Sequence, residues 1–476
     1  MMMYKVVIGL EIHCELNTKS KVFSPSENVY STFHNSNLSV VDLGFPGVLP
    51  TLNKEALIKA LTVSKALNCS IPDVILFDRK NYFYPDLPKG YQITQSHKPF
   101  GVDGYLMVNL DDYDKKVLIH DIHLEEDTAS IDHYSNYSLL DYNRAGMPLI
   151  EIVTEPVLNS SKEVLAFLDA LRRVIIYLDL SEARVDKGQI RCDVNISLMR
   201  ENDSKLGTKV EIKNINSFYN VKDAIDYEIK RQSEILDNNG VIIQETRRYD
   251  DNTKSTISMR SKVDAIDYKY FVEPNIPCMK ISCEILEEVE RRMVRLPFDR
   301  YKYYVDNLGL NMVDATTLVK DRQISDYFEE CLQYDVSPKS IANVLNSTVL
   351  GYLNKNNLSI LDVSLTPNML ISLIKMVEEG KITSKQGKEV LLKSLDSGKD
   401  PVTLVSELNI TQINSDEEIR GIVRNVIVNN SNMVEKYKSG RNVLDFFIGN
   451  VMKETKGRAN PKLTSDIVKD ELDKLC

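Results

Sequence analysis

Residues 141–156 read DYNRAGMPLIEIVTEP, and this stretch organises the interpretation of the whole chain. A turn around Gly146, followed by a proline and the apolar run of residues 149–153, predicts a loop that leads into a buried strand. Glu151 lies in the middle of that run. An unpaired buried carboxylate costs several kcal/mol, so Glu151 needs a cation, a metal or several hydrogen-bond donors. A structural salt bridge to Arg144 or another basic residue, and an acidic functional site, both fit this stretch.

The overall composition is that of a soluble globular protein. The chain has 476 residues, with 43% hydrophobic and 27% charged residues, and this length predicts about three domains. It contains no apolar run of the roughly 18 residues that a membrane span needs. A strand pattern begins almost at residue 1, with no secretory or transit signal before it, so we expect a cytoplasmic protein.

Cysteine usage and net charge exclude several classes of protein. The seven cysteines are scattered and form no C-x-x-C pair, which disfavours a disulfide framework and a cysteine-rich zinc site. The net charge of −10 argues against a protein coated in nucleic acid, although it leaves room for a local basic patch.

Residues 6–16 form the first strand in this interpretation. Their apolar and polar residues alternate, and the alternation places Glu11 and His13 together on the polar face. Carboxylate oxygens and a neutral imidazole suit magnesium, manganese or zinc. A solvated strand face explains the same pattern, so this segment alone does not decide between the two readings.

Residues 119–127, IHDIHLEED, bring histidine and carboxylates together a second time. Strict alternation would place Glu125 with His123 on one face and Glu126 on the other. A β-bulge would reverse this assignment. The choice between Glu125 and Glu126 therefore stays open at this point.

Acidic residues recur on the polar faces of successive predicted strands, which now include residues 189–198 and 210–218. We expect them to line a magnesium site: Glu11, His13, Glu125 or Glu126, Glu151, Asp193 and Glu211. The magnesium would hold ATP phosphates, and nearby cations would neutralise the charge that develops in phosphoryl transfer: Arg79, Lys80, Lys89, Arg144, Arg191 and Lys213. The chain has no P-loop and no kinase motif set, so an ATP site here has a different design.

The pattern changes along the chain. Residues 54–68 and 161–178 predict amphipathic helices, the second capped by Ser160 or Ser161. Residues 22–50 predict a long irregular loop. From residue 284 onward the pattern is almost purely helical, and Thr366-Pro367 and Asn460-Pro461 predict the starts of two of these helices.

The carboxyl-terminal region carries a basic patch. Residues 436–462 hold seven basic side chains against two acidic ones. The patch contains KGRANPK beside a predicted helix start, which suits binding to a phosphate backbone. A solvated terminal helix is the alternative explanation.

Eight segments of this chain, in order, resemble the family of B subunits of the aspartyl/glutamyl-tRNA amidotransferases. They are IGLEIHCELNTKSKVFS, FDRKNYFYPDLPKGYQITQ, IHLEEDTA, LLDYNRAGMPLIEIVTEP, GQIRCDVNISL, GTKVEIKNINSF, QETRRYDD and FFIGNVMKETKGRANPKL. Short motifs arise by chance, but eight in order do not. The resemblance implies an α+β fold: a cradle-shaped, β-rich catalytic domain at residues 1–294, a helical domain at 295–406 and a helical, tRNA-binding tail at 407–476.

The resemblance also implies an activity and partners. The family phosphorylates the side-chain carboxylate of Glu or Asp on a misacylated tRNA with ATP. Ammonia from a glutaminase, the A subunit, then displaces the phosphate in a heterotrimer that also contains a C subunit. The expected catalytic residues are Glu11, His13, Glu126, Glu151 and Lys89, with Mg²⁺ at the carboxylates. The expected tRNA contacts are Lys453, Lys456, Arg458 and Lys462.

One loop departs from the family. Many members carry four cysteines there that look like a zinc site, where this chain has Ser24, Ser26, Ser39 and Asp42. Hydroxyl groups are poor zinc ligands. We therefore predict no structural zinc and a loop held by packing.

Two rival functions remain at the level of sequence. In a metal-dependent hydrolase, Glu11, His13 and Glu151 would activate water. The absence of an H-E-x-x-H helix and the basic tail weigh against it. In a non-catalytic tRNA-binding scaffold, the acidic face would be structural.

Overall fold

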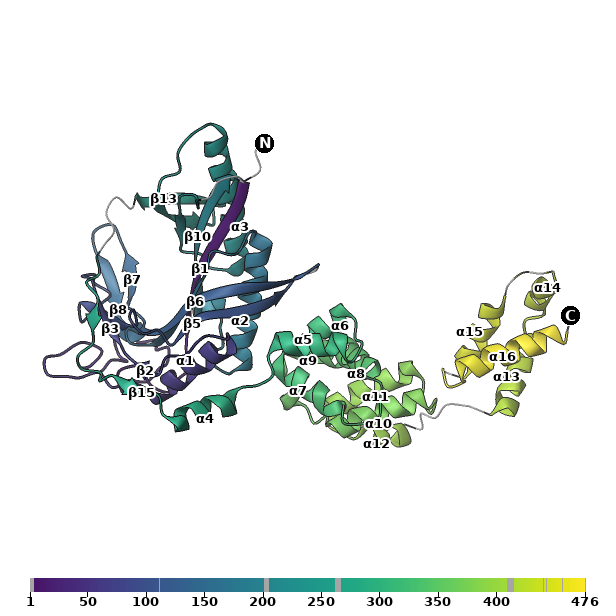
Figure 1. Ribbon diagram of the computed structural model, residues 1–476. Coiled ribbons are helices and arrows are strands. Elements are labelled where there is room, and N and C mark those ends of the chain that lie inside the picture. Colours follow the sequence, from purple (N-terminus) through teal and green to yellow (C-terminus); the bar gives the residue numbers. More distant parts are fainter. Residues whose placement is uncertain are drawn as a thin grey trace. The chain divides into compact units, whose positions relative to one another are not determined.

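The computed structural model describes residues 4–110, 112–200, 205–261, 267–408, 415–439, 441, 443–455 and 457–475 (Figure 1). The chain separates into two compact units, residues 1–299 and 300–476. Strands dominate the first unit and helices make up the second. This confirms the predicted α+β class, with a β-rich amino-terminal part followed by helical parts.

The described strands all belong to the first unit. Their bounds are β1 Tyr4–Glu15, β2 Val74–Ile75, β3 Asp78–Asn81, β4 Tyr91–Thr94, β5 Gly101–Asn109, β6 Asp114–Glu126, β7 Ser130–His133, β8 Ser138–Asp141, β9 Pro148–Thr154, β10 Ile190–Arg200, β11 Val210–Lys213, β12 Glu245–Asp250, β13 Ser255–Ser261, β14 Phe271–Val272 and β15 Met279–Lys280.

The helices occur in both units. In the first unit they are α1 Lys54–Ala66, η1 Tyr142–Arg144, α2 Ser161–Tyr177, η2 Val185–Lys187, α3 Phe218–Asp237, α4 Cys283–Arg292 and the beginning of α5 Pro297–Asp306. In the second they are α6 Met312–Leu318, α7 Arg322–Cys331, α8 Pro338–Val344, η3 Leu345–Val349, α9 Leu350–Asn356, η4 Ile360–Asp362, α10 Pro367–Glu378, α11 Ser384–Ser397, α12 Pro401–Glu407, α13 Asp416–Val428, α14 Ser431–Lys438, α15 Leu444–Glu454 and α16 Pro461–Asp473.

An eight-stranded sheet is the frame of the first unit. Its strand order is β13-β12-β11-β10-β1-β9-β6-β5, and its central strands pair antiparallel. β1 lies in the middle, paired with β10 and β9, and its alternating sequence supplies one apolar and one polar face. The predicted strand at residues 6–16 is confirmed, with slightly different ends.

The two faces of the sheet have opposite character. The apolar face buries residues such as Ile12, Ile152 and Val194, and α1, α2 and α3 contribute to the same hydrophobic core. These helices lie against the sheet in Figure 1. The polar face therefore stays clear of this core, and its charged side chains are positioned by the rigid strands.

Local signals placed several helix starts correctly. The Ser160 hydroxyl accepts a hydrogen bond from the backbone N–H of Glu163, which caps α2. Thr366 caps α10 with Pro367 as its first residue, and Asn460 caps α16 in the same way. In the described part of the chain, the cysteines are free thiols and no helix is long and apolar enough to cross a membrane.

Candidate functional site

The candidate site begins with the register of three central strands. His13 of β1 lies opposite Glu151 of β9, and Glu151 lies opposite His123 of β6. Directly opposed residues of antiparallel strands project to the same face. The register therefore gathers two imidazoles and a carboxylate on the polar face, and Glu125 joins them two residues beyond His123.

Three side chains of this group can hold a metal ion. One nitrogen of His13 and one oxygen each of Glu125 and Glu151 lie within 4.8 Å of one another. The Nε2 atom of His13 is 3.4 Å from Glu151 Oε2 and 3.9 Å from Glu125 Oε1. Glu125 is buried, and the other two are partly buried. An imidazole with two carboxylates suits a hard divalent cation such as magnesium or manganese. We call His13, Glu125 and Glu151 the carboxylate cluster.

His123 extends the cluster on one side. Its Nε2 atom lies 2.9 Å from Glu151 Oε2, and its Nδ1 atom lies 3.3 Å from Asp121 Oδ1. Glu151 thus lies between His13 and His123, while Asp121 orients the second imidazole. Such a carboxylate–histidine chain fixes ring orientation around metal sites.

Electrostatics tie the protonation states in the cluster together. Burial lowers the pKa of His13 and His123, but Glu151 and the other nearby carboxylates outweigh burial, so both pKa values are raised. Burial raises the pKa of Glu151, yet the two imidazoles hold it well below its ordinary value. Burial and the charge of Glu151 raise the pKa of Glu125. The imidazoles therefore neutralise the carboxylates of the cluster only when they bind protons.

The structure separates Glu125 from Glu126. Strict alternation holds at this end of β6, because the bulge lies earlier, between Ile119 and Asp121. Glu126 accepts hydrogen bonds from Lys89 Nζ at 2.5 and 2.6 Å and from the backbone N–H of Ile93 at 2.8 Å. Glu125 belongs to the carboxylate cluster, whereas Glu126 and Lys89 form a separate buried ion pair.

The other predicted metal ligands form a neighbouring group. Glu11 lies opposite Asp193 in the register, and its carboxylate accepts a hydrogen bond from Asn195 at 2.8 Å. Lys213 Nζ lies 2.7 Å from Asp193 and 3.2 Å from Glu211. Lys213, which we expected to neutralise phosphate charge, thus pairs with two of the carboxylates that we expected to bind magnesium.

Two of the predicted phosphate-binding cations lie on the short strand β3 and point differently. Arg79 forms a two-point ion pair with Glu273, at 2.5 and 3.0 Å, and lies over the Tyr91 ring. Lys80 lies over the Tyr268 ring, 4.9 Å from its centroid. Burial lowers the pKa of Lys80, but the charges of Glu125 and Glu151 raise it above its ordinary value. Neighbouring residues of a strand point to opposite faces, so Lys80 lies on the face of β3 opposite to Arg79, and the charges of the cluster act on it.

Arg144 and Arg191 share one buried carboxylate. Asp127 Oδ2 accepts hydrogen bonds from Arg144 Nε at 2.9 Å and from an Arg191 Nη at 3.0 Å. Arg191 lies opposite His13 in the register, so this group adjoins the carboxylate cluster. Of the predicted salt-bridge partners of Glu151, Arg144 is wrong, because it pairs with Asp127. The basic partners of Glu151 are His13 and His123.

The segment of residues 16–53 between β1 and α1, which we call the early loop, is held by hydrogen bonds as well as by packing, which corrects the expectation of packing alone. Asp42 accepts hydrogen bonds at 2.6 Å from each of the Ser24 and Ser26 hydroxyls. The Ser39 hydroxyl and backbone N–H donate to it at 3.0 and 2.8 Å. Asp42 is buried, and a buried carboxylate needs several donors. The four positions thus converge on one another through hydrogen bonds.

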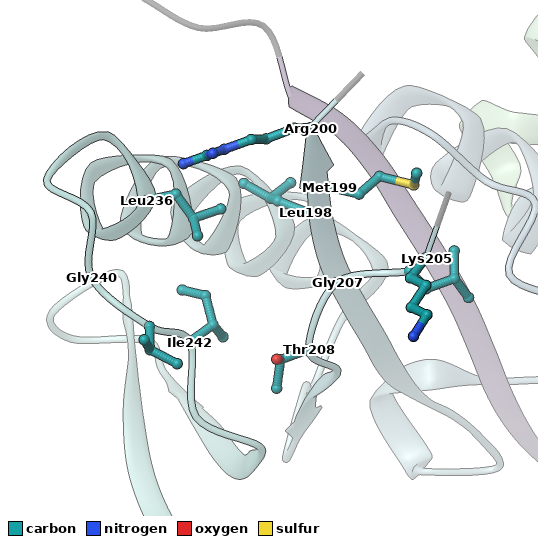
Figure 2. A pocket seen from close by; sticks show the side chains of 11 residues that line it. Leu198, Met199, Arg200, Lys205, Gly207, Thr208, Leu236, Gly240 and Ile242 are labelled. Atoms are coloured by element: carbon teal, nitrogen blue, oxygen red, sulfur yellow. The ribbon is translucent and has the colours of Figure 1, made fainter. Parts of the chain in front are cut away.

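The sheet also carries a pocket that is separate from the carboxylate cluster. It has a volume of about 480 Å³ and opens between the end of β10 and the segment after α3. Figure 2 shows Leu198, Leu236 and Ile242 among its lining side chains, with Arg200 at its edge. None of the carboxylate-cluster residues lines it.

Comparison with known proteins then decides the family. Residues 6–287 match the GatB/GatE catalytic domain, and residues 326–472 match the GatB domain. The chain belongs to this family.

Its relatives include proteins named as the B subunit of aspartyl/glutamyl-tRNA(Asn/Gln) amidotransferase. The one from Persephonella marina is 44% identical over 99% of this chain and 100% of the relative, and the one from Geobacillus thermodenitrificans is 44% identical with the same coverage. The relative from Halalkalibacterium halodurans is 42% identical over 99% of this chain. Membership of the GatB family does not favour a metal-dependent hydrolase or a binding scaffold.

Three of the four residues that we predicted to contact tRNA lie in the described part of the tail of this GatB-family chain. Lys453 lies at the end of α15, Arg458 between α15 and α16, and Lys462 in the first turn of α16. All three side chains are exposed. Lys456 lies outside the described residues.

Sequence reasoning did not assign a site role to three residues that shape this region. His123 was placed on the polar face of its strand but was not chosen as a site residue. A usable signal was present, because His123-x-Glu125 is the reverse of the Glu11-x-His13 pattern in β1. Asp127 and Lys21 gave no signal, because their partners are distant in sequence: Arg191 for Asp127, and the carbonyl of Ala145 for Lys21.

Proposed function

We propose that this chain activates and amidates the side-chain carboxylate of Glu, Asp or both on misacylated tRNA, as the B subunit of a tRNA-dependent amidotransferase. A carboxylate is a poor electrophile, because its leaving group would be oxide. ATP converts it to an acyl phosphate and ADP; ammonia then forms the C–N bond and phosphate leaves. The carboxylate cluster on the polar face of the sheet, in a chain of the GatB family, is the observation that carries this proposal.

The donor set of the cluster fits a divalent cation. His13, Glu125 and Glu151 would hold Mg²⁺ through one nitrogen and carboxylate oxygens, and this set leaves room for other ligands in a preferred six-coordinate shell. Bound Mg²⁺ would neutralise phosphate charge and orient the ATP. Asp121 and His123 would fix the orientation of Glu151.

The cations of the chain itself have complementary roles. The charges of Glu125 and Glu151 act on the ammonium group of Lys80, so we assign Lys80 to the oxygens of the transferred phosphoryl group. Arg144 and Arg191 are partly exposed beside the cluster and pair with Asp127 on one side. Their remaining N–H groups suit an anion, because a guanidinium group carries five N–H donors.

Ammonia and tRNA come from outside this chain. We propose a glutaminase A subunit and a small C subunit as partners in a cytoplasmic heterotrimer, in keeping with the relatives' designation as B subunits. We also propose division into domains at residues 1–294, 295–406 and 407–476. Three separate buried apolar clusters support this division, one in the sheet unit and two among the helices.

The tail is the proposed tRNA contact. Replacing Lys453, Lys456, Arg458 and Lys462 by Gln should weaken tRNA binding and reduce the slope of log K against log salt by about 0.7–0.9 for each phosphate group that the variant no longer neutralises. The matched control replaces Lys385, Lys388 and Lys393, exposed lysines on α11. Equal tRNA affinity of the tail variant and the control at physiological salt would exclude this contact.

One assay tests the proposed function directly. The chain, purified with its two partner proteins, is given ATP, Mg²⁺ and ammonium, with and without Glu-tRNA carrying the glutamine anticodon or Asp-tRNA carrying the asparagine anticodon. We expect ADP release that depends on the misacylated tRNA, together with Gln-tRNA or Asn-tRNA. Absence of tRNA-dependent ADP with both substrates would contradict catalysis by this chain.

A further inference from the structure

Lys21 is a fully buried cation that the proposed chemistry does not use. Its side chain is 0% exposed, and its Nζ atom lies 3.9 Å from Asp42 Oδ2. It donates hydrogen bonds to the carbonyl oxygen of Ala145 at 2.7 Å and to that of Asn37 at 3.0 Å. A buried ammonium group needs this many partners, because desolvation penalises the charge. Lys21 thus joins the early loop to the turn that follows Arg144.

The contact between Lys21, Asp42 and this turn is close. The backbone N–H of Val22 donates to the carbonyl of Gly146 at 3.0 Å. Gly146 has a φ of +84°, and a Cβ atom there would lie 2.8 Å from Asp42 Oδ1. Only glycine suits both the left-handed backbone and this approach. The turn at residues 144–146 therefore packs directly against Lys21 and Asp42.

The same turn determines where Arg144 lies. The backbone N–H of Gly146 donates to the carbonyl of Asp127 at 3.0 Å, and Asp127 N–H donates to the carbonyl of Met147 at 2.9 Å. The Arg144 guanidinium then reaches the Asp127 carboxylate, which it shares with Arg191. Lys21 acts on the residue next to Arg144, through the Ala145 carbonyl, rather than on the carboxylate cluster itself.

We propose that Lys21 and Asp42 are positioning residues for the amidation reaction, which hold the Ala145 carbonyl so that Arg144 stays beside the carboxylate cluster. This inference rests on the proposed function, because it assigns Arg144 a role in that reaction. In this proposal the early loop supports the active site through a chain of contacts. The serines donate hydrogen bonds to Asp42, Asp42 forms an ion pair with Lys21, and Lys21 donates a hydrogen bond to the turn at Ala145. A merely structural pair would support the fold without affecting catalysis by Arg144.

Lys59 provides the matched control. It is also a buried lysine, and its Nζ donates to Asn17 Oδ1 at 2.7 Å and to the carbonyl of Asp179. It lies on α1 and holds a different loop. Lys59→Met therefore removes a buried ammonium group of the same kind without touching the turn at residues 144–146.

The test measures kcat and KM for amidation, and the melting temperature, in the complete heterotrimer with ammonium as nitrogen donor. We expect Lys21→Met to lower kcat at least tenfold, with KM for tRNA within twofold of wild type. Lys59→Met, with a comparable loss of melting temperature, keeps kcat within twofold. Lys21→Gln, which restores an N–H donor, recovers part of kcat. Equal kcat for Lys21→Met and Lys59→Met would overturn the proposal.

A double-mutant cycle tests the route through Arg144. In the background of Arg144→Ala, Lys21→Met should lower kcat by less than twofold, because the group it positions is already gone. A full tenfold effect in that background would also overturn the proposal. If Lys21→Met does not fold, the same comparison uses Lys21→Met/Asp42→Asn, which leaves no unpaired charge. An inactive wild-type complex would instead count against the proposed function.

Discussion

Two groups of buried charge lie next to each other on this sheet, and they are balanced differently. Asp127 faces two guanidinium groups, which stay charged at any physiological pH. Within the described residues, the ion pairs of Glu125 and Glu151 are with imidazoles, which are neutral unless they bind protons. We call the first group complete with respect to cations, because two permanent positive charges face its one carboxylate. Among the residues that the structure describes, the second group has no permanent positive charge within ion-pair distance, so it can accept a cation. We call it the incomplete group.

The largest expected effect comes from the incomplete group. Glu151→Gln should lower the amidation rate about 100-fold or more, because even partners in the outer shell of metal sites contribute 10–100-fold. The melting temperature should fall only slightly, because the ion pairs with His13 and His123 are lost but the imidazoles can release their protons and Glu125 loses a repulsive neighbour. Rate assays and calorimetry measure both quantities. A large loss of stability would show that Glu151 is structural.

The complete group should respond in the opposite way. Asp127→Asn leaves Arg144 and Arg191 without their shared carboxylate, and arginine cannot release its proton. We expect a loss of about 2 kcal/mol in the free energy of unfolding, less than for a fully buried pair because both arginines reach solvent. Chemical denaturation measures it. Asp132→Asn, at an exposed position of β7, is the control, and equal stability of the two variants would remove the distinction between the groups.

Metal should affect only the incomplete group. Mg²⁺ or Mn²⁺ at 100 times its dissociation constant should stabilise the wild-type chain by about 2.7 kcal/mol, because it binds the folded state alone. Glu151→Gln should lose this stabilisation, and Asp127→Asn should keep it. A thermal shift that is equal in wild type and Glu151→Gln would place the cation elsewhere.

The smallest expected effect is the pH dependence. The pKa values of His13 and His123 are raised, so in metal-free protein their ion pairs with Glu151 are fully present below about pH 6.5 and are lost as pH rises through the raised values. Metal affinity should change in the opposite direction, because binding displaces protons from the imidazoles. Titration calorimetry in two buffers of different ionisation enthalpy should detect proton release at neutral pH. Proton uptake would contradict this assignment.

Local sequence predicted what depends on local periodicity. Alternation placed Glu11 and His13 on one face of β1, and cap residues placed the starts of α2 and α10. Alternation alone left the choice between Glu125 and Glu126 open, because the choice depends on the position of the bulge in β6, which the sequence does not give.

Pairings between distant charges were not predictable in the same way. Lys89 pairs with Glu126, Arg79 with Glu273 and Arg144 with Asp127. Each pairing depends on which loops the fold brings together, and on the rule that a buried charge must be paired there. A set of basic residues near an acidic motif contains no such information.

The most direct test of the central claim is the position of a bound cation. Crystals of the complex grown with Mn²⁺ would show its anomalous scattering. We predict one peak bound by His13 Nε2 and by oxygens of Glu125 and Glu151, at about 2.1–2.3 Å from each. Mn²⁺ bound only at Glu11, Asp193 and Glu211, with the carboxylate cluster empty, would contradict the claim that the unbalanced group is the metal site.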